Sequence, residues 1–172
     1  MIEALLACGP RFLAILAALA GAIASISAAW GFQLIGGFIP CALCYAQRVP
    51  YYLGIPVLVV ALAVSRRGDI PRLGSLLLLV AAAIFAYGAY LGAFQAGAEW
   101  GFWDGPRDCA TSGAAAVTKA GDLLAAMAQT RIVSCTEVQL RIFGLSFAGW
   151  NVVVSAGLVG LCAFAALGRA RT

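Results

Sequence analysis

The stretch FLAILAALAGAIASISAAWGFQLI, residues 12–35, contains no charged residue. A helix needs roughly 20 apolar residues to cross the hydrocarbon core of a bilayer, so this stretch is long enough to span a membrane. Three further apolar stretches cover approximately residues 41–65, 73–94 and 143–167, and the only charge among them is Arg48. We therefore predict an all-α membrane protein in which a single membrane domain, residues 1–172, forms a bundle of four transmembrane helices.

The composition supports this class. Of the 172 residues 63% are hydrophobic and 10% are charged, and the mean hydropathy is +0.98. A soluble domain of this length needs far more polar surface. The chain has no His, which excludes mixed Cys/His zinc sites and Ser-His or Cys-His catalysis within this chain. The net charge of +4 is modest and no basic run alternates with aromatic residues, so we expect a lipid bilayer and no nucleic acid as a partner.

The distribution of charge predicts the orientation, because cytoplasmic loops carry an excess of Lys and Arg. With four spans, both termini and the hairpin SRRGDIPR at 65–72 share one side, which has a net charge of +4, and the other side has a net charge of zero. We therefore expect the first side to be cytoplasmic and the long segment 95–142 to face outward. Residues 11–28 also resemble a signal peptide, but their apolar stretch is longer than the usual core of one.

The cysteines fall into three pairs on this topology. Cys41 and Cys44 lie in the short outward loop at the start of the second span, and Cys109 and Cys135 lie in the long outward segment. These four face a compartment where disulfides can persist. The remaining two, Cys8 and Cys162, lie toward the cytoplasmic side, where we expect small buried apolar side chains.

The motif PCALCYAQR, residues 40–48, points to redox chemistry. Pro40 suits the start of a helix, and the N-terminus of that helix stabilises an anion on Cys41 or Cys44. Arg48 lies four residues after Cys44, so we expect the two on the same helix face one turn apart, where the arginine would favour the Cys44 thiolate. Disulfides of the Cys-x-x-Cys type exchange readily in redox proteins.

Other interpretations of the same residues stay open at this point. A zinc site would need two more ligands, and Cys109 and Cys135 are not a second Cys-x-x-Cys motif, so we predict no metal. Taken alone, the pair Cys109–Cys135 is more typical of a structural disulfide, which could stabilise its loop by roughly 3 kcal/mol. Arg48 alone could equally well extend to a lipid phosphate.

A family resemblance becomes specific once these parts are combined. Four spans, the motif PCALCYAQR in the first outward loop and a second Cys pair in the next resemble the bacterial disulfide-bond formation protein B (DsbB) family. The stretch CTEVQLRIFGLSFAGWN, residues 135–151, is similar to the start of that family's fourth span. The resemblance implies a protein-dithiol:quinone oxidoreductase of the bacterial inner membrane. Its partner would be a periplasmic DsbA-like protein with a thioredoxin fold, and its electron acceptor ubiquinone or menaquinone.

The resemblance also implies a role for each cysteine of the outward side. Cys109 would form the mixed disulfide with the partner, Cys135 would exchange with Cys41, and Cys44 would be released as the thiolate that engages the quinone. The active cysteines would face the periplasm.

Three further residues match the quinone site of the family. Arg48 matches an arginine beside the quinone, and Phe147 matches a residue that lines the same pocket. Gln95 is the best match for a histidine near the quinone headgroup. Since Gln cannot carry a proton at neutral pH, a histidine-based proton role is in doubt for this chain.

Two alternatives to this enzyme are a non-enzymatic tetraspan membrane protein with structural loop disulfides, and a quinone-linked thiol oxidase with a different partner, including a relative of vitamin K epoxide reductase. That reductase family is expected to carry its Cys-x-x-Cys in a later span. Within the outward segment, residues 114–129 suit either a short helix lying on the membrane or a loop of small residues.

Overall fold

The computed structural model describes residues 9–67, 71–105, 136 and 138–168. The helices in this part of the chain are α2 (Pro10–Leu34), α3 (Ala42–Ala46), α4 (Val49–Arg67), α5 (Pro71–Glu99) and α7 (Phe147–Leu167). Four helical stretches within it are long and apolar enough to cross a membrane, namely Pro10–Leu34, Ala42–Arg66, Arg72–Glu99 and Phe147–Leu167. The second of these combines α3 and α4. The predicted all-α bundle of four transmembrane helices is therefore confirmed.

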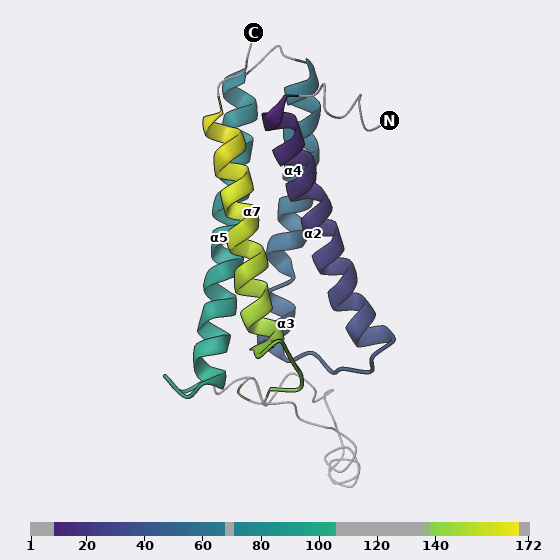
Figure 1. Ribbon diagram of the computed structural model, residues 1–172, viewed down its shortest axis with the longest axis vertical. Helices are drawn as coiled ribbons and strands as arrows, with labels where there is room; N and C mark the ends of the chain where they lie inside the picture. The colour runs from purple at the N-terminus through teal and green to yellow at the C-terminus, as the bar shows by residue number, and fades with distance from the viewer. Residues whose placement is uncertain (1–8, 68–70, 106–135, 137, 169–172) are drawn as a thin grey trace, which may run out of the picture.

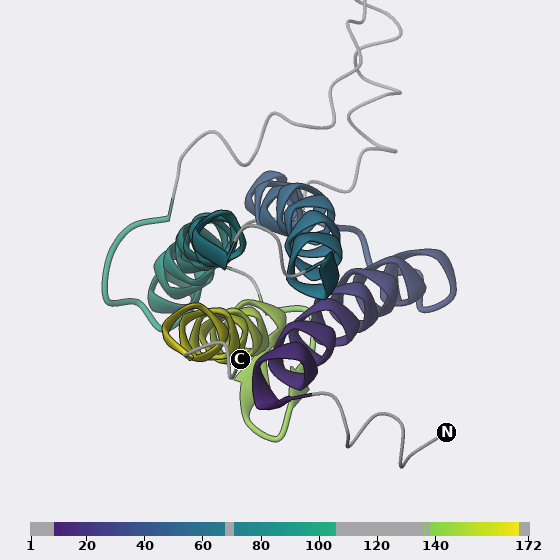
Figure 2. The same ribbon diagram turned by 90° about the horizontal axis from the view of Figure 1, so that it is seen from above.

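The four long helices run along one common direction, as Figure 1 shows. Helix α2 begins and α7 ends at one end of the bundle, and α3 lies at the opposite end. Seen along the bundle in Figure 2, α4, α5 and α7 form a compact group, and α2 leans away from them toward the end that holds α3. The leaning of α2 opens the bundle at the end where the sequence places the Cys-x-x-Cys motif.

Small side chains let the helices approach closely in the core. Ala14, Ala18 and Ala22 follow one another at one-turn spacing on the buried face of α2. Phe85 of α5 is fully buried and its ring packs directly on Gly54 of α4. The remaining buried apolar residues of this core are Ile15, Tyr51, Leu58, Ala61, Leu78, Ala81, Leu158, Cys162 and Ala165. Cys162 is thus a small buried apolar side chain, as predicted, whereas Cys8 lies outside the described residues.

A polar cluster joins the three helices α4, α5 and α7. The Tyr51 hydroxyl of α4 donates to Asn151 Oδ1 of α7 at 2.7 Å and lies 3.2 Å from Ser155 Oγ. Asn151 Nδ2 in turn donates to the Gly88 carbonyl of α5 at 3.1 Å. Because no water is available in the hydrocarbon region, these polar groups satisfy one another and fix how α4, α5 and α7 are rotated.

The helix ends differ from the expected bounds at two places. Helix α5 continues to Glu99, beyond the expected end of the third span at residue 94. Helix α7 begins at Phe147 instead of residue 143, because Ser146 Oγ accepts a hydrogen bond from the Gly149 N–H and caps the helix. The first difference shortens the predicted outward loop 95–142 at its start, and the second extends it to residue 146. Cys109, Cys135 and the segment 114–129 lie outside the described residues.

A short β-hairpin precedes this cap. Strand β1 (Arg141–Ile142) pairs antiparallel with β2 (Leu145–Ser146), and the turn between them consists of Phe143 and Gly144. Both turn residues have positive φ, 52° and 83°, as a two-residue hairpin of the primed type requires. The Trp150 indole N–H donates to the Ile142 carbonyl at 2.9 Å and so fastens the hairpin to α7.

The contact between Gly54 and Phe85 yields a first prediction. A Cβ atom at residue 54 would lie 2.5 Å from Phe85 Cζ, and the buried ring has little room to move. We expect Gly54→Ala to lower the free energy of unfolding by about 1–3 kcal/mol, the usual cost of overpacking a core. The measurement is reversible unfolding in mixed detergent micelles. Gly157→Ala is the control, since a Cβ there meets nothing within 4 Å, and equal stability of the two variants would contradict the prediction.

Candidate functional site

The Cys-x-x-Cys pair lies at the start of the short helix α3. Cys41 is the N-cap, and its Sγ accepts a hydrogen bond from the Cys44 N–H at 3.2 Å. The two sulfur atoms are 2.6 Å apart, so they are within reach of each other for disulfide formation. Cys41 is buried and Cys44 is half-buried. One turn of helix thus holds a dithiol with both sulfurs side by side.

The chain breaks its helix directly after this pair. Helix α3 ends at Ala46, and α4 begins at Val49. At the junction the Arg48 N–H bonds to the Tyr45 carbonyl at 3.0 Å, a spacing of three residues instead of four. Pro50 has no N–H, so it cannot bond to the Ala46 carbonyl and continue one regular helix. The break changes the direction in which the Arg48 side chain leaves the backbone.

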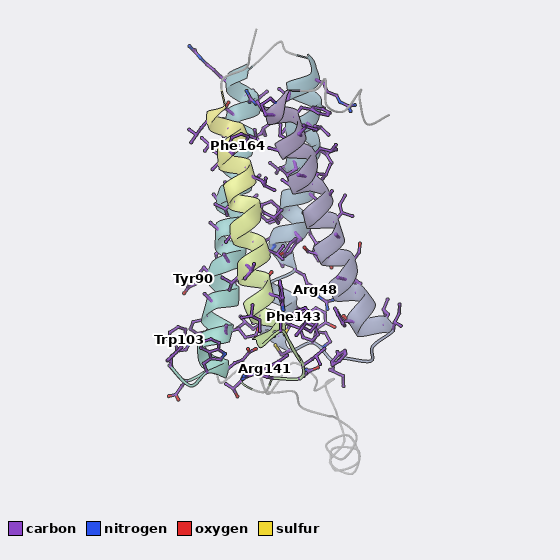
Figure 3. All side chains as sticks on the ribbon, in the orientation of Figure 1. Arg48, Tyr90, Trp103, Arg141, Phe143 and Phe164 are labelled. Atoms are coloured by element: carbon purple, nitrogen blue, oxygen red, sulfur yellow. The ribbon has the colours of Figure 1, made fainter. Side chains whose placement is uncertain are left out.

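The position of Arg48 corrects the expectation that it lies on the face of Cys44. Its guanidinium turns toward α2, where NH1 donates to Gln33 Oε1 at 2.7 Å and NH2 to the Ala29 carbonyl at 3.4 Å. The rings of Trp30 and Tyr45 lie 5.0 and 5.1 Å from the guanidinium carbon. The expectation was wrong because it assumed an unbroken helix. Figure 3 shows Arg48 at the same end of the bundle as Trp103, Arg141 and Phe143, opposite Phe164.

Gln95 of α5 occupies the place beside Cys44 that was expected for the arginine. Its Nε2 lies 3.6 Å from Cys44 Sγ, within reach of a weak hydrogen bond to sulfur. Its Oε1 accepts from Gln47 Nε2 at 2.6 Å, and its Nε2 also donates to Glu99 Oε1 at 3.2 Å. Gln47 and Gln95 are 7% and 5% exposed, so this network is shielded from solvent. A buried chain of amides therefore connects the dithiol to a carboxylate.

One cavity of about 370 Å³ collects these groups. It lies between α2, the α3–α4 junction, α5 and the start of α7, and most of its lining is apolar. Five of the residues proposed from the sequence line it: Cys41, Cys44, Arg48, Gln95 and Phe147. The other two, Cys109 and Cys135, lie outside the described residues. The structure thus brings together residues from three separate parts of the chain.

Aromatic rings form one wall of the cavity. Phe147, at the start of α7, packs against Phe32 of α2 and Phe38 of the following loop, with ring centroids 5.0 and 5.6 Å apart. Phe32 and Phe38 also contact each other edge to face at 6.1 Å. The sulfurs and amides line the same cavity. Such a cavity suits a flat, apolar ligand that has a few hydrogen-bonding atoms.

The two sulfurs are electrostatically unequal. Cys41 lies one residue before the membrane-spanning stretch Ala42–Arg66. The hydrogen bond between its sulfur and Cys44, together with burial, raises the pKa of the Cys41 thiol. Cys41 therefore holds its proton more firmly when the pair is reduced, so the structure favours Cys44 as the reactive sulfur.

The polar residues of the cavity that were not found from the sequence include Gln33, Gln47 and Glu99. Glu99 follows Gln95 by four residues, so a third span extended by one turn would have placed the two on one face. Gln33 interrupts an apolar span near its end, which is a detectable but weak signal. Among the described residues no group of three or more His, Cys, Asp or Glu side chains could hold a metal ion.

Comparison with known proteins identifies a family. The family model of disulfide bond formation protein DsbB matches residues 10–165, which is most of the chain. Curated proteins and solved structures gave no match. The matched range includes every residue named in the cavity.

The contact between Arg48 and Gln33 generates the second prediction. Gln33→Leu removes the acceptor 2.7 Å from NH1 and leaves a buried charged donor without it. We expect the free energy of unfolding to fall by about 1.5–3 kcal/mol, as for a hydrogen bond to a charged group. Gln33→Glu keeps an acceptor and is the matched control. If unfolding in detergent micelles showed no loss for Gln33→Leu, Arg48 would not depend on α2.

Proposed function

The chain belongs to the DsbB family, which makes it a multi-pass membrane oxidoreductase of disulfide formation, and from this premise we propose that it is a protein-dithiol:quinone oxidoreductase. In this proposal the chain reoxidises a periplasmic DsbA-like protein with a thioredoxin fold. The electrons then pass through Cys109–Cys135 and Cys41–Cys44 to ubiquinone or menaquinone.

One observation carries the proposal: the Cys41–Cys44 pair lines an apolar cavity that also contains a guanidinium group. A disulfide that served only to hold loops together would need neither a cavity nor a buried arginine. A charged side chain within a membrane span is costly and marks a functional site by default. Arg48 is 7% exposed and lines this cavity with the sulfurs.

The residues of the cavity fit a quinone headgroup. Its volume of about 370 Å³ falls in the range of small-molecule sites, and its aromatic wall suits a flat ring. Arg48 has five N–H donors, and the described residues accept from two of its nitrogens. Arg48 and Gln95 would hold the ring oxygens and Phe147 the ring face. When bound, the quinone supplies an acceptor for two electrons and two protons.

The cysteines of the chain would act in sequence. The partner's thiolate attacks Cys109 and forms a mixed disulfide, which frees Cys135. Cys135 then attacks Cys41, and the Cys41–Cys44 bond breaks to release Cys44 as a thiolate. Each exchange breaks one S–S bond and forms another, so the two electrons of the partner's dithiol reach Cys44 without any other oxidant.

We propose the orientation that the charges indicate. Arg11, Arg66 and Arg72 belong to the helix ends opposite α3, and this end would face the cytoplasm. The end that holds α3 and the β-hairpin would then face the periplasm of a bacterial inner membrane. The partner would reach the cysteines from that side.

The alternative of a non-enzymatic tetraspan protein disagrees with membership of an oxidoreductase family. It also leaves unexplained why Gln47 and Gln95 are buried around a dithiol. In that alternative the disulfides would be indifferent to quinone, and the next experiment separates the two functions.

The third prediction concerns Cys44. Cys44→Ser removes the sulfur that we assign to the quinone, so we expect quinone reduction to be abolished. The measurement is the loss of quinone absorbance in detergent after addition of a reduced DsbA-type protein, tested with ubiquinone and menaquinone. Cys162→Ala is the control, because Cys162 is buried in the core away from the cavity, and it should keep wild-type activity. Full turnover by Cys44→Ser would falsify the proposed function.

The fourth prediction concerns Arg48. Arg48→Ala removes donors to the ring oxygens but leaves both sulfurs in place, so we expect the apparent KM for quinone to rise by about tenfold or more. The rate of thiol exchange with the partner should stay the same. Arg141→Ala, an exposed arginine of β1 that does not line the cavity, is the control. An unchanged KM in Arg48→Ala would remove Arg48 from the quinone site.

A further inference from the structure

Quinone reduction needs protons as well as electrons, and the chain has no His to supply them. Gln95, which stands where the family resemblance placed a histidine, bears an amide that donates a hydrogen bond without titrating. Arginine side chains donate hydrogen bonds but do not act as proton donors in proteins, which excludes Arg48. Another side chain of the cavity must therefore exchange protons with the bound ring.

Glu99 has the geometry for this task. It is the last residue of α5, lines the cavity, and accepts a hydrogen bond from Gln95 Nε2 at its Oε1 atom. Its other oxygen, Oε2, is buried and has no hydrogen-bond partner in the described part of the chain. One side of the carboxyl group is thus held in place and the other is free.

A free buried carboxylate oxygen has a physical consequence. An ionised carboxylate without a partner is expensive in an apolar site, so it either takes up a proton or accepts a hydrogen bond from a ligand. A proton donor passes through both of these states: it is protonated before the transfer, and afterwards it is a carboxylate that accepts a hydrogen bond from the ligand. Glu99 is also the last residue of α5, and Trp100 and Asp104, which follow it in the chain, are exposed. Water at this end of the bundle can therefore return the proton.

The other titratable or charged groups around the cavity do not fill this role. They are Cys41 and Cys44 at the start of α3, Arg48 at the α3–α4 junction, and Tyr51 of α4. Helices α2 and α7 contribute no titratable or charged group to the described lining. The cysteines carry the electrons, and the Tyr51 hydroxyl is engaged with Asn151 and Ser155. Glu99 is the one carboxyl group among the described lining residues.

We propose that Glu99 is the proton-exchanging residue of the quinone site and that Gln95 positions it next to Cys44. This inference rests on the proposed function and adds the proton route to it. In the net reaction the partner's two S–H bonds are lost and one S–S bond forms, so two electrons and two protons leave the dithiol. Two O–H bonds form on the quinone. Glu99 gives these two protons one after the other from Oε2 and regains each from the outer aqueous side, which receives the two protons that the dithiol releases.

The test compares Glu99→Gln with wild type, Glu99→Asp and Asp104→Asn. Glu99→Gln keeps the size and the hydrogen bond to Gln95 but cannot carry a proton. Glu99→Asp keeps the carboxyl group. Asp104→Asn removes the same charge from an exposed residue that does not line the cavity, and is the matched control. Thermal unfolding in detergent establishes that all four proteins are folded.

Three quantities are measured on each protein. The first is the rate constant of quinone reduction as a function of pH. The second is the affinity for quinone, from quenching of Trp fluorescence. The third does not depend on turnover: it is the infrared difference spectrum recorded while bound quinone is reduced in an electrochemical cell, which reports the C=O stretch of a protonated carboxyl group.

We expect Glu99→Gln to reduce quinone about 100-fold more slowly, the lower range for loss of general acid catalysis, with unchanged quinone affinity. The carboxyl band should vanish, and the pH dependence of the rate should differ from that of wild type. Glu99→Asp should keep the band and part of the rate, and Asp104→Asn should match wild type. A Glu99→Gln protein with the wild-type rate, pH profile and band would overturn the assignment alone. Absence of quinone reduction by wild type would overturn the proposed function as well.

Discussion

The arrangement of the candidate site depends on the hydrogen bonds of the Gln95 side chain. An amide donates and accepts at the same time, so Gln95 can accept from Gln47 at 2.6 Å while it donates to Glu99 at 3.2 Å and approaches Cys44. A carboxylate there could only accept, and a hydrocarbon side chain could do neither. Because these partners belong to α5 and to the α3–α4 junction, the amide also fixes where α5 lies relative to the dithiol. A buried amide without a hydrogen-bond partner is costly, so each hydrogen bond of this network depends on the others.

The buried charge of Arg48 imposes a second constraint on the fold. A guanidinium that is 7% exposed requires compensation, and here the compensation comes from α2 through Gln33, the Ala29 carbonyl and the ring of Trp30. Helix α2 leans away from the other helices at this end, so these contacts help to hold it there (Figure 2). The same break between α3 and α4 that sends Arg48 to α2 leaves the space beside Cys44 to Gln95. The guanidinium and the sulfurs thus line one cavity, but the hydrogen bonds of Arg48 go to α2 and those of Cys44 to Gln95.

The sequence was sufficient for the number and class of the helices, because apolar stretches long enough to span a bilayer are visible without any contact information. The sequence did not predict which face of each helix packs against its neighbours, because a helix that is apolar on all sides gives no such signal. The start of α7 was misplaced because the apolar stretch continues through the turn at Phe143, although the Ser146 cap was there to be read. The pairing of Cys44 with Arg48 failed on one assumption, that the helix continues past Ala46. Glu99 was missed because the third span was ended one turn too early.

In the proposed mechanism, electron transfer and proton transfer occupy different side chains within one site. The sulfurs would carry the electrons, and Glu99, the last residue of α5, would carry the protons. Gln95 contacts both and does not titrate, so its geometry stays the same over a wide range of pH. A histidine in its place would combine the positioning role and the proton role, and its charge would change the field at the sulfurs each time it titrated. With an amide in that position, protonation at Glu99 can change while the hydrogen bond to Cys44 remains. A chain without His can in this way keep the environment of its dithiol constant and still exchange protons at the cavity wall.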